Sequence, residues 1–177
     1  MLFLIGSGGL IKKVLFPAEV LPIVTVLSNM VHFFFGLPIL VVFLVYYHRT
    51  TLNIGELVWF PIIVAIQLVL TTGLAFILSA LTVHFRDIKD ILGNILTFWF
   101  FATPIIYPMS QTPAYLRTWM NLNPFTHLAI SYQEVLFYPG PFGHMKWLLV
   151  LGAASVATFL VGYFLFDRLR DSFAEEV

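Results

Sequence analysis

The chain has 177 residues, of which 60% are hydrophobic and only 10% charged, and its nine basic residues balance nine acidic ones. Soluble domains are about 45–50% apolar and about 25% charged, so this composition excludes an ordinary soluble globule and predicts a membrane protein. The zero net charge gives no argument for nucleic-acid binding, and the absence of cysteine excludes disulfides, thiolate metal sites and cysteine nucleophiles.

The N-terminal segment is apolar at its start but too short to cross a membrane. No secretory signal peptide with a cleavage site is apparent. Residues 9–22 form an amphipathic stretch directly before the first long apolar run, with two lysines next to apolar side chains. Such an element either rests on the membrane surface or docks on a cytoplasmic partner. The residues concerned are Lys12, Lys13, Leu15 and Phe16.

Four apolar stretches predict membrane-spanning helices, because a span needs roughly 20 mainly apolar residues. Helix is the expected form, since lipid offers the backbone no hydrogen-bond partners and these stretches lack the period-2 alternation of a barrel. The predicted fold class is all-α: a polytopic transmembrane helical bundle with four spans, plus re-entrant or interfacial helices before the last span. The predicted spans of this single domain are residues 21–46, 57–83, 91–107 and 147–166.

Lysine and arginine are distributed unevenly between the two sides of the predicted bundle. Cytoplasmic loops carry the excess of these residues, so the bias predicts both termini, including the tail 167–177, in the cytoplasm. The richer side holds Lys12, Lys13, Arg86, Lys89, Arg168 and Arg170, and the poorer side holds Arg49, Arg117 and Lys146.

The third predicted span ends in an aromatic segment broken by prolines, residues 98–108. Pro104 and Pro108 are expected to kink or end the helix and to free backbone carbonyls. Broken helices of this kind mark permeation paths more often than plain anchors. Its aromatic side chains suit stacking on sugar rings or an interfacial belt, and for Tyr107 the belt is the default interpretation.

The proline-containing region 109–146 stays apolar and aromatic. Residues 125–138 show helical spacing but are too few to span, which predicts a re-entrant or interfacial helix. We weigh two interpretations equally: a re-entrant region at a pore exit, and an external loop with a helix lying on the membrane. A second short amphipathic piece is predicted from Tyr115, Leu116, Trp119 and Met120.

Residues with catalytic or metal-binding potential are sparse. The histidines lack metal-ligand spacing, and His32 is too isolated within its span for a proton relay. No Walker A phosphate loop is found, so the chain does not bind ATP in that way by itself. We predict no metal site, no catalytic residues and no enzymatic activity. The alternative, an intramembrane enzyme acting on lipid-linked sugars, would depend on His127, Glu134 and Asp87. The remaining histidines are His48, His84 and His144.

Five stretches, in order along the chain, resemble the permease subunits of ABC-2 type exporters of polysaccharides such as O-antigen, capsule and teichoic acid. The segment Trp99-Phe-Phe-Ala-Thr-Pro104-Ile-Ile-Tyr107-Pro108 is the most specific match. The others are residues 10–22, 81–88, 121–124 and 166–176.

This resemblance implies a dimer of permeases in the bacterial inner membrane, each paired with a separate P-loop ATPase that binds ATP and Mg²⁺, and no cofactor in this chain. The implied substrate is a lipid-linked glycan moved outward. ATPase coupling would involve Lys12, Lys13, Phe16, Pro17 and Glu19. The substrate path or gate would be formed by Trp99, Phe101, Pro104, Tyr107, Pro108, Phe125 and Tyr132, with the rest of the segment 125–138.

Two features depart from the resemblance. Family members usually carry two more spans before the coupling segment, so we expect the sequence to be a fragment or a short form. A structural or assembly subunit is therefore a further alternative. Gln133 also stands where many relatives are expected to carry a basic residue, so headgroup binding is not predicted there.

Overall fold

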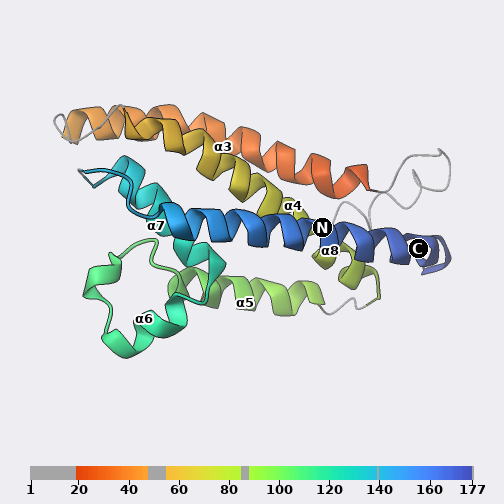
Figure 1. The fold of residues 1–177 in the computed structure, drawn as a ribbon. Coiled ribbons are helices and arrows are strands. Elements are labelled where there is room, and N and C mark those ends of the chain that lie inside the picture. Colours follow the sequence, from red (N-terminus) through yellow and green to blue (C-terminus); the bar gives the residue numbers. More distant parts are fainter. Residues whose placement is uncertain (1–18, 48–54, 85–87, 139, 177) are drawn as a thin grey trace. The chain divides into compact units, whose positions relative to one another are not determined.

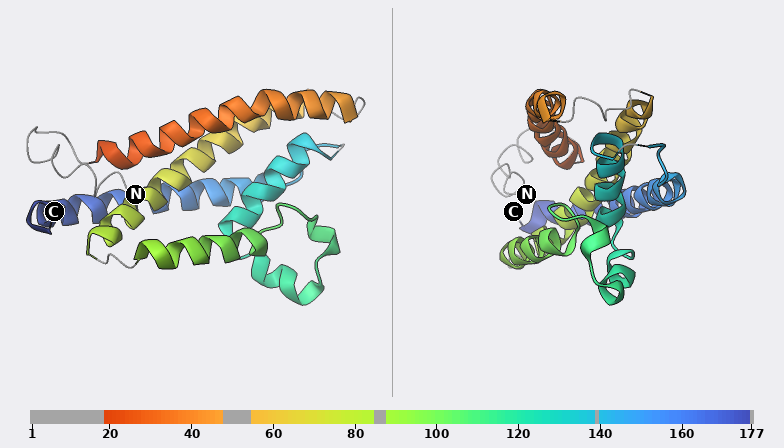
Figure 2. Two further views of the ribbon diagram at one scale, coloured as in Figure 1. Left: turned by 180° about the vertical axis from the view of Figure 1, so that it is seen from behind. Right: turned by 90° about the vertical axis from the view of Figure 1, so that its left-hand side faces the viewer.

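The computed structural model describes residues 19–47, 55–84, 88–138 and 140–176. These residues form helices and no strand (Figures 1 and 2), which confirms the all-α prediction. The long helices are α3 (Val20–Tyr47), α4 (Trp59–His84), α5 (Ile88–Ala102) and α8 (Met145–Glu176), and the shorter ones are η1 (Glu56–Val58), η2 (Met109–Gln111), α6 (Ala114–Met120) and α7 (Pro124–Leu136).

Part of the predicted coupling and loop segments lies outside the described residues. Of the coupling residues only Glu19 is described, in a turn that leads into α3. The remaining predictions in these segments stay predictions. They concern Lys12, Lys13, Phe16, Pro17, Arg86 and Asp87.

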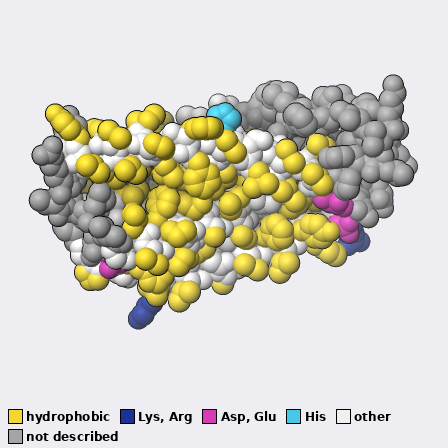
Figure 3. All heavy atoms as spheres, turned by 90° about the horizontal axis from the view of Figure 1, so that it is seen from above, with side chains coloured by type: hydrophobic (Ala, Val, Ile, Leu, Met, Phe, Trp, Pro, Cys, Tyr) yellow, Lys and Arg dark blue, Asp and Glu magenta, His cyan; other side chains and the backbone are white. Residues whose placement is uncertain are grey.

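Among the described residues, three helices are long and apolar enough to cross a membrane: Val20–Tyr46, Glu56–Thr82 and Met145–Leu169. The shortest has 25 residues, which at a rise of about 1.5 Å per residue exceeds the roughly 30 Å of a bilayer core. Hydrophobic side chains dominate the face drawn in Figure 3. Polar side chains inside α4 donate to their own helix, as Thr72 does to the carbonyl of Leu68 at 2.7 Å.

The third predicted span is shorter than expected. Helix α5 ends at Ala102 and not at Tyr107, and its apolar part covers only Ile91–Ala102. The 15 residues of α5 extend roughly 22 Å, which is less than the bilayer core. The prediction of a helix through Tyr107 is wrong because Pro104 disfavours helical backbone at the residue before it. Helix α8, in contrast, continues beyond Phe166 through most of the predicted tail.

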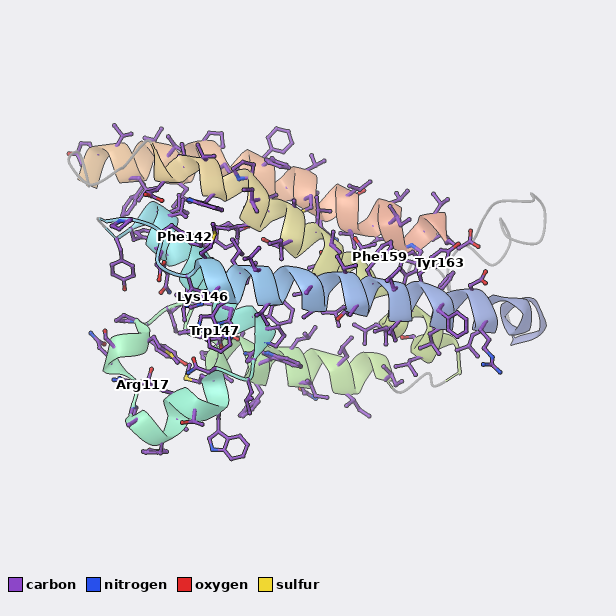
Figure 4. All side chains as sticks on the ribbon, viewed as in Figure 1. Arg117, Phe142, Lys146, Trp147, Phe159 and Tyr163 are labelled. Atoms are coloured by element: carbon purple, nitrogen blue, oxygen red, sulfur yellow. The ribbon has the colours of Figure 1, made fainter. Side chains whose placement is uncertain are left out.

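Contacts divide the chain into two compact units. The first unit consists of Met1–Gly36, Leu68–Leu92 and Ala154–Val177. Its described core is a cluster around Phe76, Ala80 and Phe166, each fully buried. Phe159 and Tyr163 project from α8 (Figure 4), and each ring lies 5.8 Å from the Phe76 ring in an edge-on arrangement.

Two glycines bring α4 and α8 into backbone contact in the first unit. A Cβ placed on Gly73 would lie 2.6 Å from the backbone nitrogen of Phe159. A Cβ on Gly162 would collide with the carbonyl oxygen of Gly73. Small residues permit such close helix crossings in membranes, where van der Waals packing drives association.

We expect Gly73→Ala to destabilise the protein, because the added methyl group meets backbone atoms that cannot move aside. Overpacking of this kind costs about 1–3 kcal/mol, so the thermal midpoint in detergent micelles should fall by roughly 2–10 °C. The matched control is Gly93→Ala in α5, where no heavy atom lies within 4 Å of the new Cβ. Equal midpoints for the two variants would contradict the close crossing.

Candidate functional site

The second unit consists of Leu37–Gln67 and Gly93–Ala153, and its central feature is the broken end of α5. Pro104 has no N–H and ends the regular hydrogen bonding. The Thr103 hydroxyl turns back to the carbonyl of Trp99 at 2.9 Å. The carbonyl of Pro104 accepts a 2.7 Å hydrogen bond from the side chain of Gln133 in α7. Both Thr103 and Pro104 are buried, so these bonds satisfy groups that water does not reach.

Asn123 connects this helix end to α7. Its Oδ1 accepts hydrogen bonds from the Trp99 indole at 2.9 Å and from the Phe125 backbone N–H at 3.0 Å. Its Nδ2 donates to the Thr103 hydroxyl at 3.0 Å. The bond to Phe125 is a helix N-cap, and Pro124 at the first helical position suits this start. One amide thus orients Trp99 and starts α7.

The loop between α5 and α6 is held by its own polar side chains. The Tyr107 hydroxyl donates to the carbonyl of Phe101 at 2.9 Å. Arg117 in α6 donates to the carbonyls of Thr112 and Ser110, both at 2.7 Å, and is labelled in Figure 4. The Arg117 guanidinium therefore makes both of these hydrogen bonds to backbone carbonyls of the loop.

A groove of about 810 Å³ lies between the end of α5, this loop and α6. Its walls are mainly apolar and aromatic. Several of its large side chains are well exposed, including Phe98, 75% exposed, and Trp119, 72% exposed. The lining consists of Ile95, Phe98, Trp99, Phe101, Ala102, Tyr107, Gln111, Thr112, Pro113, Leu116, Trp119, Met120 and Asn123.

The described lining of the groove contains no histidine, carboxylate, lysine or arginine. Its polar groups are amides and hydroxyls, among them the Thr112 hydroxyl, which is buried and has no hydrogen-bond partner among the described residues. Such an arrangement suits an uncharged ligand with flat apolar faces and hydroxyl groups.

The structure brings together five of the seven predicted path residues around the groove or its supporting break. Trp99, Phe101 and Tyr107 line the groove, and Pro104 ends the helix that forms its wall. Phe125 lies edge-on to Trp99 with ring centroids 5.8 Å apart. Their position does not test whether they act as a gate, so that role stays a prediction.

The other two predicted path residues do not line the groove. Pro108 precedes η2 in extended backbone. Tyr132 lies in α7, where its hydroxyl donates to Gln67 of α4 at 2.5 Å and its ring contacts Phe60. Burial raises the pKa of Tyr132, so the phenol remains protonated and acts as the donor.

Four residues central to the site were not predicted as site residues. Leu116 and Trp119 belong to the amphipathic piece recognised in the sequence, and α6 places both against the groove. Asn123 has a local signal, since asparagine before proline is typical of a helix start. Gln133 has no local sequence signal, because its contact with Pro104 joins positions 29 residues apart.

A second polar cluster joins α7 to the start of α8. His127 Nδ1 lies 3.0 Å from His144 Nε2, and His127 Nε2 lies 2.8 Å from the carbonyl oxygen of Asn121. The His127 ring stacks on Trp147 at 4.5 Å. His144 Nδ1 lies 3.8 Å from a carboxylate oxygen of Glu134.

These contacts assign the tautomers of the neutral rings. A backbone carbonyl only accepts, so His127 carries its proton on Nε2 and accepts at Nδ1 from His144 Nε2. Neutral His144 therefore directs an unprotonated Nδ1 towards Glu134. Burial lowers the pKa of His144 from its ordinary 6.5, the nearby Glu134 carboxylate opposes this shift, and His127 adds to it.

The Glu134 carboxylate has a structural role at this junction. It accepts hydrogen bonds from the backbone N–H groups of Gly143 at 3.1 Å and His144 at 3.0 Å. In the same region Glu56 accepts from the backbone of Phe142 at 3.1 Å. Of the residues that the enzyme alternative named, His127 and Glu134 are hydrogen-bonded within this junction and do not line the groove, and Asp87 lies outside the described residues. No group of three or more metal-ligating side chains occurs among the described residues.

Comparison with known proteins gives consistent matches. The sequence profile of the ABC-2 type transporter family matches residues 1–137. The chain is 39% identical over 170 residues to a Myxococcus xanthus protein named O-antigen export system permease protein RfbA, covering 95% of this chain and 64% of that protein. It is 29% identical over 171 residues to a Klebsiella pneumoniae protein of the same name, covering 97% of this chain and 65% of that protein. The chain thus spans somewhat less than two thirds of these relatives.

We expect Asn123→Ala to destabilise the second unit, because it removes the N-cap of α7 and the hydrogen bonds of Asn123 with the Trp99 indole and the Thr103 hydroxyl, which keeps its bond to the Trp99 carbonyl. Loss of a cap costs about 1 kcal/mol and each lost hydrogen bond about 0.5–1.5 kcal/mol more. Thermal unfolding followed by tryptophan fluorescence measures the effect. The matched control is Asn121→Ala, since the exposed Asn121 contributes its backbone carbonyl and not its side chain. Asn123→Asp, which keeps the cap acceptor, should fall between the two.

We expect stability to decrease as the pH falls below about 6.5, because the folded state lowers the pKa of His144 and so binds fewer protons than the unfolded state. Above pH 6.5 His144 is mainly neutral in both the folded and the unfolded state, so the free energy of unfolding is not reduced. The free energy of unfolding decreases as the pH falls from 6.5 towards the lower pKa of His144 in the folded state. Thermal midpoints in detergent between pH 8 and pH 5 (roughly the window of histidine titration) measure it. His144→Gln should flatten this dependence, and an unchanged slope would show that His144 does not cause it.

Proposed function

We propose that this chain, which belongs to the ABC-2 type transporter family, acts as the membrane-spanning permease subunit of an ATP-driven exporter of lipid-linked polysaccharides. The observation that carries the proposal is the 39% identity, over 95% of the chain, to a protein named as an O-antigen export permease. Three span-length helices in the described residues agree with a membrane subunit.

ATP hydrolysis is assigned to a separate partner chain. The sequence has no Walker A phosphate loop, the element that cradles the phosphates of ATP in P-loop ATPases. In this proposal ATP and Mg²⁺ bind to that partner, which docks on residues 9–22. The coupling contacts are Lys12, Lys13, Phe16, Pro17 and Glu19.

The groove is the part of the structure that fits a glycan best. Pyranose rings have apolar faces and hydroxyl edges, and the groove offers aromatic faces at Trp99, Phe101 and Trp119 together with amide and hydroxyl groups. Its position at the broken end of α5 matches the discontinuous helices that line transport paths. We place this end of α5 towards the outer face of the bacterial inner membrane and both termini in the cytoplasm.

A structural or assembly subunit is the second candidate. This candidate predicts a stable complex with the partner chains but no export.

The proposal is tested by a mild-detergent pulldown of the tagged chain from its native membranes. We expect a P-loop ATPase to co-purify and to be identified by mass spectrometry. Replacing Lys12, Lys13 and Phe16 together by alanine should reduce the recovered ATPase by about tenfold, because two charges and an aromatic contact at the interface centre are lost.

The matched control is Lys146→Ala, which removes an exposed lysine at the start of α8, outside the proposed docking segment. It should leave ATPase recovery unchanged. Absence of any ATPase from the unmodified complex would overturn the exporter proposal. Recovery of the ATPase without glycan export in a strain that depends on this chain would favour the assembly subunit.

A further inference from the structure

Two histidine rings face each other at the junction of α7 and α8, and each has a further polar neighbour. His127 Nδ1 lies 3.0 Å from His144 Nε2. On the other side of the His127 ring, Nε2 lies 2.8 Å from the carbonyl oxygen of Asn121. On the other side of the His144 ring, Nδ1 lies 3.8 Å from a carboxylate oxygen of Glu134. We call these four groups the histidine row, which has a backbone carbonyl at one end and a carboxylate at the other.

The histidine row is largely enclosed by the protein. His127 is only 6% exposed, and the side chains of His144 and Glu134 are 14% and 26% exposed. The His127 ring also stacks on Trp147, with ring centroids 4.5 Å apart and ring planes 8° apart, at the start of α8 where Figure 4 labels Trp147. Because water has little access to the row, each ring proton needs an acceptor within it.

No other described charge belongs to the histidine row. The remaining charged side chains of the second unit, among the residues that the structure describes, are Glu56, Arg117 and Lys146. Glu56 and Arg117 are bonded to backbone groups outside the row, and Lys146 is exposed. The charges that act on His144 come from its two neighbours in the row. The number of protons that the row binds is therefore set by its own members.

In the neutral row, the acceptors fix the positions of two ring protons. His127 Nε2–H donates to the Asn121 carbonyl, and His144 Nε2–H donates to His127 Nδ1. A further proton has one open position, His144 Nδ1, which faces the Glu134 carboxylate. With that proton bound, each N–H still points to an acceptor, and the new contact is charge-assisted. Moving the central proton from His144 to His127 gives a second form in which the contacts are equally complete.

One more proton has no place in the histidine row. The nitrogen still without a proton would be His127 Nδ1, or His144 Nε2 after the central transfer, and either one faces an N–H of the other ring at 3.0 Å. Two imidazolium rings offer only donors, so both N–H groups would point at each other without an acceptor. The two like charges would also disfavour each other at this distance. A second added proton therefore requires the rings to separate.

We propose that His127 and His144 form a single proton-binding site at the α7–α8 junction, which takes up one proton between the two rings and excludes a second. The site does not rest on the proposed export function, since none of its four groups belongs to a groove-lining residue. Asn121 nevertheless stands two positions before Asn123, whose amide orients Trp99. Proton uptake therefore places a positive charge beside the turn that supports the groove wall.

Nitrogen NMR of the whole chain, labelled with ¹⁵N in its histidine rings and held in detergent micelles, counts these protons directly. The nitrogen chemical shift distinguishes a bare ring nitrogen, the protonated nitrogen of a neutral ring and an imidazolium nitrogen. His127→Gln and His144→Gln assign the signals. Between pH 8 and pH 5 (roughly the window of histidine titration), we expect the protons on the two rings to increase from two to three and no further.

The contribution of the carboxylate is tested with Glu134→Gln, which removes the negative charge and keeps an oxygen able to accept from the backbone of Gly143 and His144. An opposite charge favours the protonated ring, so its loss should weaken proton binding by at least about tenfold, which lowers the midpoint of uptake by about one pH unit. The matched control is Glu56→Gln, which changes a carboxylate bonded to the Phe142 backbone outside the row. It should leave the midpoint unchanged.

Three outcomes would overturn the inference. Uptake of two protons within this pH window would show two independent histidines. Absence of any uptake would show that the row does not bind a proton. Equal midpoints for Glu134→Gln and Glu56→Gln would show that the carboxylate of the row does not hold the added proton. None of these outcomes bears on recovery of the ATPase, which tests the proposed function separately.

Discussion

The second unit depends on one side-chain amide, that of Asn123. Its oxygen accepts from Trp99 and from the first turn of α7, and its nitrogen donates to Thr103. These three bonds join the end of α5, which Pro104 interrupts, to the start of α7, while the carbonyl of Pro104 itself is paired by Gln133. A side chain that both donates and accepts is able to bond to both helices at once. The orientation of Trp99, and with it the wall of the groove, follows from this arrangement.

The requirement that buried backbone N–H and C=O groups have hydrogen-bond partners also accounts for three further contacts among the described residues. Where backbone groups lose their regular partners, a nearby side chain replaces them: Gln133 at the carbonyl of Pro104, Arg117 in the loop before α6, and Glu134 at the start of α8. Buried carbonyl and N–H groups are paired in nearly all proteins, and in lipid the requirement is stricter. The Gln133 contact joins positions 29 residues apart, whereas the contacts of Arg117 and Glu134 stay within 5 to 10 residues and fix the local course of the chain.

The long helices could be predicted from the sequence because hydropathy over 20 or more residues reports directly on the lipid environment. The third predicted span was drawn to Tyr107 because apolar residues continue that far, and of the two outcomes expected of Pro104, a kink or an end, the structure shows an end, with α5 closing at Ala102. The helix of residues 125–138 was recognised from its spacing, and α7 covers Pro124–Leu136. The contacts of Asn123 with Trp99 and of Gln133 with Pro104 join residues 24 and 29 positions apart, and local patterns carry no information on such pairs.

The groove also lacks fixed charge among its described lining residues, and Arg117 nearby is bound to backbone carbonyls. In the proposed function, an uncharged glycan in this groove would be held by contacts between its ring faces and the aromatic side chains and not by ion pairs. Screening acts only between charges, so the proposal implies an interaction that depends little on ionic strength.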